Sequence, residues 1–425
     1  VSFVALPLAL GIALASGVPP MAGLLSAVIG GVVTTFFRGS HLAINGPAAG
    51  LITVVLGSIM ALDDGSGQAL NYVLAAIMVS GGLQVIFGLL KLGRYADIFH
   101  PTVIKGILAA IGIIIIAKQI HLALGTGVKS TSVVSDLTGV FTHFKDINPF
   151  VAVISLMGLI LLLFASRISY KIFHFLPAPT WVLVLAIPLV YAFNFFDPHS
   201  LDFFGRAYEV GPELLVSVPD NVLDAIAHPN FSKIGTLPFW VSVLSICMVS
   251  SIASLASSKA VDRLDPYKRK TDLNKDLIGI GMSTMVSGAL GGLPIVTVIV
   301  RSSVNVHNHA KTKWSNLYHG LILIAFILLL APVIQQIPLS ALAILLVYTG
   351  FKLASPKVVK SIFKQGPEQL VFFFGTIIIV IFTDILVGIF GGLALALLTH
   401  LVMVKVSVRR FFTMIFNSGS NLFEN

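Results

Sequence analysis

A long apolar region is interrupted at Gly291-Gly292-Leu293-Pro294-Ile295-Val296-Thr297-Val298-Ile299-Val300-Arg301-Ser302-Ser303-Val304-Asn305. The two glycines and Pro294 end one helix, and a new helix follows with Arg301 near its start. A helix that begins at membrane depth directs unpaired N–H groups and the positive end of its dipole into the space before it. Such backbone is tolerated there only where it is buried in protein or lines a cavity. The stretch therefore predicts an anion site of a transporter, with Arg301 supplying a full charge. The simpler alternative is a kinked helix whose Arg301 pairs with a carboxylate or a lipid headgroup.

The composition is that of a helical membrane protein. Hydrophobic residues make up 56% of the 425 residues, charged residues 11%, and the mean hydropathy is +0.97. A soluble protein of this length does not carry so much apolar surface. The net charge of +9 is therefore expected to reflect loop orientation rather than nucleic-acid binding. Cys247 is the single cysteine, which excludes a disulfide framework and a cysteine-based metal site. Because the chain begins at Val1 within an apolar run, we expect a trimmed N-terminus.

Hydropathy divides the chain into about fourteen apolar segments, several of them shorter than the ~20 residues of a full span. The third and tenth each follow a Gly/Pro break and are predicted to be broken half-helices. The expected ranges are 1–17, 21–37, 46–62, 72–90, 101–120, 149–166, 176–195, 236–259, 276–290, 295–308, 315–335, 338–352, 367–383 and 385–404. Brief β-rich runs lead into the third and tenth segments; little other strand-like periodicity is found.

The distribution of basic residues supports this division. If the N-terminus is cytoplasmic, loops after even-numbered segments together with the tail hold 19 of the 27 Lys and Arg, and the opposite loops hold four. The remaining four fall within segments. Such an asymmetry is what the positive-inside rule requires. We therefore predict a multi-pass protein of the cell (inner) membrane with both termini in the cytoplasm.

Fourteen segments divide into two sets of seven, and an odd-numbered repeat must insert upside down relative to its twin. The broken third segment then corresponds to the broken tenth, and paired interrupted segments are the best sequence indication of a transporter site. The predicted organisation is a first repeat at 1–195, an external connection at 196–235, a second repeat at 236–405 and a cytoplasmic tail at 406–425.

Catalytic signatures are missing from the sequence. It holds no HExxH, no P-loop, no dinucleotide-binding glycine pattern and no carboxylates paired at helical spacing. We therefore expect a protein that is not an enzyme and that uses no cofactor or metal. Asp262, near the inner end of the eighth segment, is a candidate coupling residue because ionisable groups inside membranes are costly. The favoured alternative is a helix-end residue that pairs with Lys259.

Several separated motifs resemble the membrane domain of the SulP family of anion permeases, also called solute carrier family 26. The resemblance covers essentially the whole chain, and the motifs are specific jointly rather than singly. It is carried by Leu6-Pro7-Leu8-Ala9-Leu10-Gly11-Ile12-Ala13, Asn45-Gly46-Pro47-Ala48-Ala49-Gly50, Ala260-Val261-Asp262, Asn274-Lys275-Asp276-Leu277-Ile278-Gly279, Gly291-Gly292-Leu293-Pro294 and Arg301-Ser302-Ser303-Val304-Asn305.

The resemblance implies an all-α polytopic fold of seven-plus-seven inverted repeats with a core domain and a gate domain. It implies an elevator-like movement of the core against the gate, and a homodimer in the lipid bilayer. It also implies a small anion held between the third and tenth segments with help from the first. Carried over by position, that pocket is Leu8, Ile12, Ala48, Ala49, Gly50, Thr297, Val300, Arg301 and Ser302.

The chain departs from the family pattern in three ways. Ala253 stands where many members carry a carboxylate associated with cation coupling, which leaves exchange, uniport or a channel-like mode open. Leu8 and Ile12 stand where a polar or aromatic residue is frequent, so backbone amides and Arg301 are expected to carry more of the recognition. The family usually ends in a cytoplasmic STAS domain, which is expected to be absent or trimmed here.

Three functions remain open at this point. The first is secondary transport of a small inorganic anion such as sulfate, bicarbonate or chloride. The second is nucleobase transport on the same fold, which would normally use carboxylates in the eighth and tenth segments. Ala253 and the lack of an acidic residue in 291–310 argue against it. The third is a membrane scaffold that transports nothing.

Overall fold

The computed structural model of the chain describes residues 1–94, 101–127, 132–165, 176–219, 226–383 and 385–404. Each predicted apolar segment coincides with a helix, which confirms the helical fold; the predicted tail at 406–425 lies outside the described residues. The matching helices are α1 (Ser2–Ala15), α2 (Pro20–Phe37), α3 (Ile52–Leu62), α4 (Ala69–Leu89), α5 (Pro101–Leu124), α7 (Pro149–Phe164), α9 (Ala178–Ala192), α10 (Leu237–Leu264), α11 (Leu273–Ala289), α12 (Ile299–His307), α13 (Trp314–Ile334), α14 (Leu339–Leu353), α16 (Pro367–Phe382) and α17 (Ile385–Val404).

The helices vary in length as the hydropathy predicts. Within the described residues, six helical stretches are long and apolar enough to cross a membrane by length and composition: α2, α4, α5, α10, α13 and Leu339–Phe363. The others, including α1, α3 and α12, are shorter. An integral multi-pass membrane protein is the class that these helices fit, while the count of fourteen spans stays a prediction.

Some elements outside the apolar segments were not predicted. Helix α6 (Val133–Thr142) lies in the loop before α7, and α15 (Pro356–Phe363) follows α14. The connection at 196–235, where we expected no strands, contains an antiparallel hairpin of β2 (His199–Phe203) and β3 (Arg206–Val210). Its turn is Phe204-Gly205, with both residues at positive φ, a geometry that favours glycine. Hydropathy over long windows misses such short polar elements.

The two halves of the chain pack in matching ways. Helix α2 packs against α13, and α4 packs against α11. In a repeat of seven segments, α2 corresponds to α11 and α13 corresponds to α4. The repeat therefore converts the first of these helix pairs into the second. The same exchange relates α7–α14 to α5–α16, and it maps the α5–α14 pair onto itself. This pattern is what an internal repeat produces, because corresponding helices inherit corresponding neighbours.

Close helix contacts in this arrangement depend on glycine. A Cβ at Gly81 of α4 would lie 2.6 Å from the carbonyl oxygen of Gly281 in α11, and a Cβ at Gly281 would lie equally close to that of Gly81. On α5 and α14, Gly112 and Gly350 face each other in the same way, with distances of 2.5 and 2.6 Å. Small residues allow backbones to approach within a membrane, where helix association depends on packing rather than on the hydrophobic effect.

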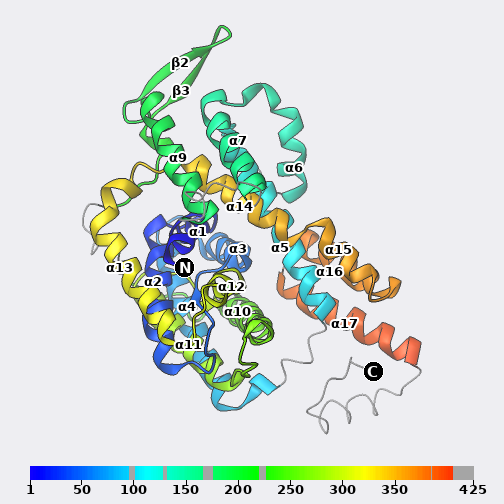
Figure 1. Cartoon of the computed structure of the whole chain (residues 1–425). Coiled ribbons are helices and arrows are strands. Elements are labelled where there is room, and N and C mark those ends of the chain that lie inside the picture. The colour runs from blue at the N-terminus through cyan, green and yellow to red at the C-terminus, as the bar shows by residue number, and fades with distance from the viewer. Residues whose placement is uncertain (95–100, 128–131, 166–175, 220–225, 384, 405–425) are drawn as a thin grey trace.

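Figure 1 shows two groups of helices. We call α1–α4 with α10–α13 the core group, and α5–α7, α9 and α14–α17 the gate group. The helix packing follows this division, with α4–α11 and α2–α13 inside the core group and α5–α14 and α16–α17 inside the gate group. The short helices α3 and α12 lie within the core group, on the side toward α5.

Candidate functional site

Two short strands bring the two Gly/Pro breaks together. Strand β1 (Asn45–Gly46) pairs antiparallel with β4 (Val296–Thr297), so that Asn45 lies opposite Thr297. After β1 the chain enters a 3-10 turn, η1 (Ala49–Leu51), and then α3; after β4 it enters α12. Each strand therefore delivers the start of a helix to the same place, as the sequence predicts. The first amides of each helix have no partner within their own helix.

The irregular backbone before α12 is stabilised by hydroxyl groups from neighbouring helices. Ser26 Oγ accepts from the amide of Leu293 at 2.5 Å, and Thr284 Oγ1 accepts from the amide of Ile295 at 3.2 Å. The amide of Val298 donates to the carbonyl of Ile44 at 2.9 Å. A non-helical segment at membrane depth is thus buried in protein and has its own hydrogen-bond partners.

A cavity of about 160 Å³ lies where the two helices begin. Eight of the nine residues expected to contact the anion line it, and Ser302 is the exception. Side chains from the gate group complete the wall. The predicted residues that line the cavity are Leu8, Ile12, Ala48, Ala49, Gly50, Thr297, Val300 and Arg301, and the gate residues are Ile104, Leu108, Leu346, Thr349 and Leu353.

Arg301 is the outstanding feature of this cavity. Its side chain is fully buried, with 0% exposure, yet Nε, Nη1 and Nη2 have no hydrogen-bond partner among the described residues. Within the described ranges, no aspartate or glutamate lines the cavity. An isolated buried charge is costly unless it is paired, by several kcal/mol. The alternative that Arg301 pairs with a carboxylate of the chain therefore finds no support in the described residues.

Ser302 has a different role from the one we expected. Its hydroxyl donates to the carbonyl of Val298 at 2.7 Å and accepts from the amide of Ile44 at 2.8 Å. It is fully buried and points away from the lining of the cavity. Ser302 therefore ties the start of α12 to the segment that leads into β1.

A chain of hydrogen bonds leads from the cavity to a buried carboxylate. Thr297 Oγ1 accepts from Asn45 Nδ2 at 3.1 Å and from Ser258 Oγ at 3.3 Å. Ser258 Oγ also lies 2.5 Å from Oδ2 of Asp276, at the start of α11. Asp276 is fully buried, and its second oxygen, Oδ1, has no partner among the described residues. The cavity wall is thus connected to an acidic group that lies outside it.

Asp262 occupies a different environment. Its two carboxylate oxygens accept from the amide and the hydroxyl of Thr271, at 2.8 and 2.5 Å. These bonds hold the link between α10 and α11 and leave Asp262 outside the cavity lining. Ala253, in contrast, does line the cavity, at the position where the family resemblance implies a carboxylate in many members.

The sequence reasoning missed the residues that support the crossing from a distance. Asn316 of α13 accepts from the amide of Asn45 at 3.1 Å and donates to the carbonyl of Gly30 at 2.9 Å. Asn305 donates to the carbonyl of Leu42 at 2.9 Å. The available signal was an asparagine at the start of an otherwise apolar segment, which inside a membrane protein indicates a hydrogen-bonding role.

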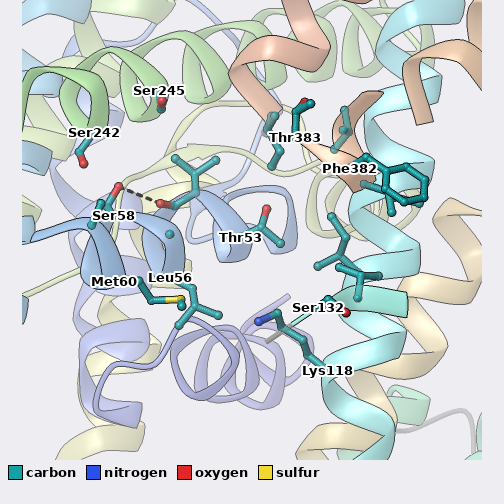
Figure 2. A pocket seen from close by; sticks show the side chains of 18 of the residues that line it. Thr53, Leu56, Ser58, Met60, Lys118, Ser132, Ser242, Ser245, Phe382 and Thr383 are labelled. Carbon is teal, nitrogen blue, oxygen red and sulfur yellow. Dashed lines mark hydrogen bonds between the residues drawn. The ribbon is translucent and has the colours of Figure 1, made fainter. Parts of the chain in front are cut away.

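A larger cavity, of about 710 Å³, lies between α3, α5, α6, α10 and the residues on either side of the α16–α17 junction (Figure 2). The hydroxyls of Ser58 and Ser245 and the amine of Lys118 are among the groups around it. Ser245 Oγ and Thr53 Oγ1 have no hydrogen-bond partner in the described part of the chain. The segment that leads into α3, from Pro47 to Gly50, lines the smaller cavity, and α3 itself lines the larger one from Thr53 to Ala61.

Comparisons with known proteins identify the family of the chain. The family model described as "Sulfate permease family" matches residues 1–376. The chain belongs to the sulfate permease family. It is 27% identical over 400 residues to the putative sulfate transporter YvdB of Bacillus subtilis, covering 93% of this chain and 71% of that protein. It is also 27% identical over 397 residues to the bicarbonate transporter BicA of a Picosynechococcus strain, covering 92% of this chain and 67% of that one.

Solved structures share the fold of this sulfate permease family member. The transmembrane domain of a cyanobacterial bicarbonate transporter BicA superimposes with a TM-score of 0.76 at 23% identity, covering 91% of this chain and 94% of that one. The structure of SLC26A9 superimposes with a TM-score of 0.79 at 15% identity, covering 96% of this chain and 64% of that one. The resemblance seen in the sequence motifs is therefore confirmed at the level of family and fold.

Proposed function

We propose that this chain is a secondary transporter of small inorganic anions, with sulfate, bicarbonate or chloride as the candidate substrates. The observation that carries the proposal is Arg301, a residue that lines the cavity and whose fully buried guanidinium has no hydrogen-bond partner among the described residues. Relatives named as sulfate and bicarbonate transporters support the substrate class.

Recognition would combine one charge with backbone amides. The starts of α12 and of η1–α3 direct their first N–H groups toward the cavity, and Arg301 lies in the first turn of α12. Ala48, Ala49 and Gly50 place little bulk over the amides on the other side. A small anion can accept from these donors at once, while the apolar remainder of the wall limits its size.

The division of the cavity wall supports an elevator-type movement. The charge and the helix starts belong to the core group, whereas the gate group contributes mostly apolar side chains, such as Ile104, Leu108 and Leu346. An anion held by core-group donors would therefore make few polar contacts that must break as the core group slides past the gate group. The larger cavity in Figure 2 is lined by α3 and α10 of the core group and by α5, α6 and the α16–α17 junction of the gate group, so it also lies between the two groups.

Uptake of labelled anions into proteoliposomes tests the function. Sulfate, bicarbonate and chloride are compared with uracil, each with and without an inward proton or sodium gradient. Saturable anion uptake that ignores both gradients is the expected result, since Ala253 provides no carboxylate at the cavity. Gradient-driven uptake would assign coupling to another group, with Asp262 and Asp276 the first to test. Uracil uptake without anion uptake would contradict the proposal and favour the nucleobase permease.

The predicted orientation has its own test. Phe204, at the tip of the β2–β3 hairpin, is 94% exposed and is expected outside, while Lys270 in the α10–α11 link is exposed and expected inside. Phe204→Cys in whole cells should react with a membrane-impermeant maleimide, and Lys270→Cys should react only after permeabilisation. The native Cys247 is buried and gives little background. The reverse labelling pattern would overturn the topology.

The homodimer stays a prediction, and mass photometry of the protein in detergent would test it.

A further inference from the structure

A second polar cavity lies where α2 ends and where α11 and α13 begin. It has a volume of about 440 Å³, and basic side chains from three separate loops surround it. The positive-inside rule places this end of the core group in the cytoplasm. The basic residues that the argument uses are Arg38, Lys270, Lys275, Lys311 and Lys313, and Asp272 is the carboxylate among the lining residues.

Arg38 is the buried member of this group. Its side chain is 6% exposed, and Nε donates to the carbonyl of Ser40 at 2.7 Å. Neither Nη1 nor Nη2 has a hydrogen-bond partner among the described residues. Asp276 attracts it electrostatically, but no hydrogen bond or ion pair between the two is found in the described part of the chain. Arg38 thus belongs to the lining of the cavity and carries two buried donors without a hydrogen-bond partner among the described residues. Its planar guanidinium is a group well matched to phosphate.

The acidic residues nearby are already engaged. Asp272 caps α11, with Oδ1 accepting from the amides of Asn274 and Lys275 at 3.1 and 3.2 Å. Asp265 is held by Arg269, whose Nε donates to it at 2.7 Å. Burial alone would raise the pKa of Asp265, but the bonds from Arg269 and from the amide of Tyr267 hold that pKa below its ordinary value. Asp265 is thus paired with Arg269, and Asp272 Oδ2 lies 3.8 Å from Lys275 Nζ. Neither carboxylate has an ion pair with Lys270, Lys311 or Lys313 in the described part of the chain.

Exposed aromatic rings lie beside the cavity. Trp314, which lines it, is 44% exposed, and its ring meets that of Phe36 edge-on with centroids 6.2 Å apart. Phe36 and Tyr318 are 57% and 62% exposed. Aromatic side chains of this kind are enriched at the level of lipid headgroups. The basic cavity therefore opens at the depth where the headgroups of the inner leaflet are expected.

We propose that this cavity binds the phosphate of an anionic phospholipid headgroup. Arg38 would donate its two free Nη groups to the phosphate, and Lys270, Lys311 and Lys313 would add positive charge. The acyl chains would pass along the exposed faces of Phe36 and Tyr318. The aromatic belt favours a lipid over a soluble phosphate, because a soluble ligand gains nothing from apolar rings outside the cavity. This proposal is independent of the transported substrate.

Lipid retention by native mass spectrometry tests it on the purified full chain. The probes are phosphatidylglycerol and phosphatidylcholine vesicles, compared at equal concentration. Wild type should retain phosphatidylglycerol preferentially. The double variant Lys270→Gln with Lys313→Gln should lower the affinity for phosphatidylglycerol by about thirtyfold, because each substitution removes one screened charge attraction to the headgroup. Arg38→Gln should lower it at least as much, but it is the secondary variant because Arg38 is buried.

A matched double variant controls for net charge. Lys357→Gln with Lys360→Gln removes two exposed lysines of α15, outside the cavity, and should leave retention within about twofold. Equal retention of both lipids by wild type would overturn the proposal, and so would unchanged retention by the Lys270/Lys313 variant. If inorganic phosphate at the same concentration protects the protein from thermal unfolding as well as phosphatidylglycerol does, the lipid assignment is wrong.

Discussion

The two helices that begin at the central cavity share a geometry but differ in chemistry. Both follow a strand of the same antiparallel pair, and residues at or just before the start of each helix line one cavity. Helix α12 adds the guanidinium of Arg301, whereas the start of η1–α3 presents Ala48, Ala49 and Gly50. One side of the site therefore offers charge, and the other offers close approach to backbone.

Under the proposed function, this difference would let the site hold an anion and still release it. A second buried cation opposite Arg301 would bind an anion tightly and would also raise the cost of the empty site. Backbone amides attract an anion without bearing a net charge that must be desolvated. The asymmetry between the starts of α12 and α3 therefore favours an anion that is released during transport over one that is bound permanently. Each side of the site can be altered by a separate substitution.

The largest effect is expected from removing the charged side. Arg301→Met should weaken anion binding and uptake by at least about thirtyfold, because the loss of a buried charged partner costs roughly 2–5 kcal/mol. Without anion the variant should unfold at the same or a higher temperature than wild type, since an unpaired buried charge is gone. Uptake and differential scanning fluorimetry measure the two quantities. The control is Arg206→Met in the exposed hairpin, and unchanged uptake by Arg301→Met would remove this residue from the site.

A carboxylate beside Arg301 should make the site sensitive to pH. Ala253→Glu places an acid on the wall that faces the cavity. When ionised, it would pair with Arg301 and compete with the anion, so uptake should fall steeply at pH 8. Protonation at lower pH removes this competition, and uptake should recover toward the wild-type rate. Ala253→Gln is the uncharged control. A pH profile identical for the two variants would contradict the predicted proximity of positions 253 and 301.

The α3 side can be tested through Gly46. A Cβ at this position would lie 2.5 Å from Nη1 of Arg301, so Gly46→Ala must displace the guanidinium. We expect the fold to be retained and the anion affinity to fall by about tenfold. This loss corresponds to the free-energy cost that is typical of an overpacked side chain. Gly57→Ala in α3 is the matched control, because nothing lies within 4 Å of a Cβ built there. Equal affinities of the two variants would show that the position of Arg301 does not depend on β1.

The smallest effect is expected from the hydrogen-bond chain behind Thr297. Asp276→Ala and Ser258→Ala each remove the contact between these side chains, and each should change uptake by only a few-fold, since neither side chain lines the cavity. The double variant should be no worse than the more affected single one, because both changes remove the same link. Additive losses in labelled uptake would show that the two residues act separately.

Much of the helical arrangement was predictable because its signals are local. Gly291, Gly292 and Pro294 predict the break in the helix, and the distribution of Lys and Arg predicts the orientation of the loops. The position of Arg301 in the first turn of α12 follows from the same break, and Arg301 is among the residues that line the cavity. Its role in anion binding stays a prediction. Local rules suffice where one segment determines its own geometry.

The remainder depends on contacts between distant segments. Which face of the nine-residue α12 looks into the cavity is fixed by the crossing of β1 and β4, and this directs Ser302 to Ile44 instead of the cavity. The contact of Ser258 with Asp276 joins two helices, and that of Asn316 with Asn45 spans 271 positions. No periodicity within a single segment encodes such pairs, so a residue-by-residue reading could not find them.

Equilibrium binding of a labelled anion to the purified protein tests the anion site most directly. Scintillation proximity binding would be measured for wild type, Arg301→Met and Gly57→Ala, with the anion that accumulates best in proteoliposomes. Saturable binding by wild type and Gly57→Ala, with binding by Arg301→Met weaker by about thirtyfold or more, is the predicted result. Equal binding by all three proteins would contradict an anion site at the start of α12.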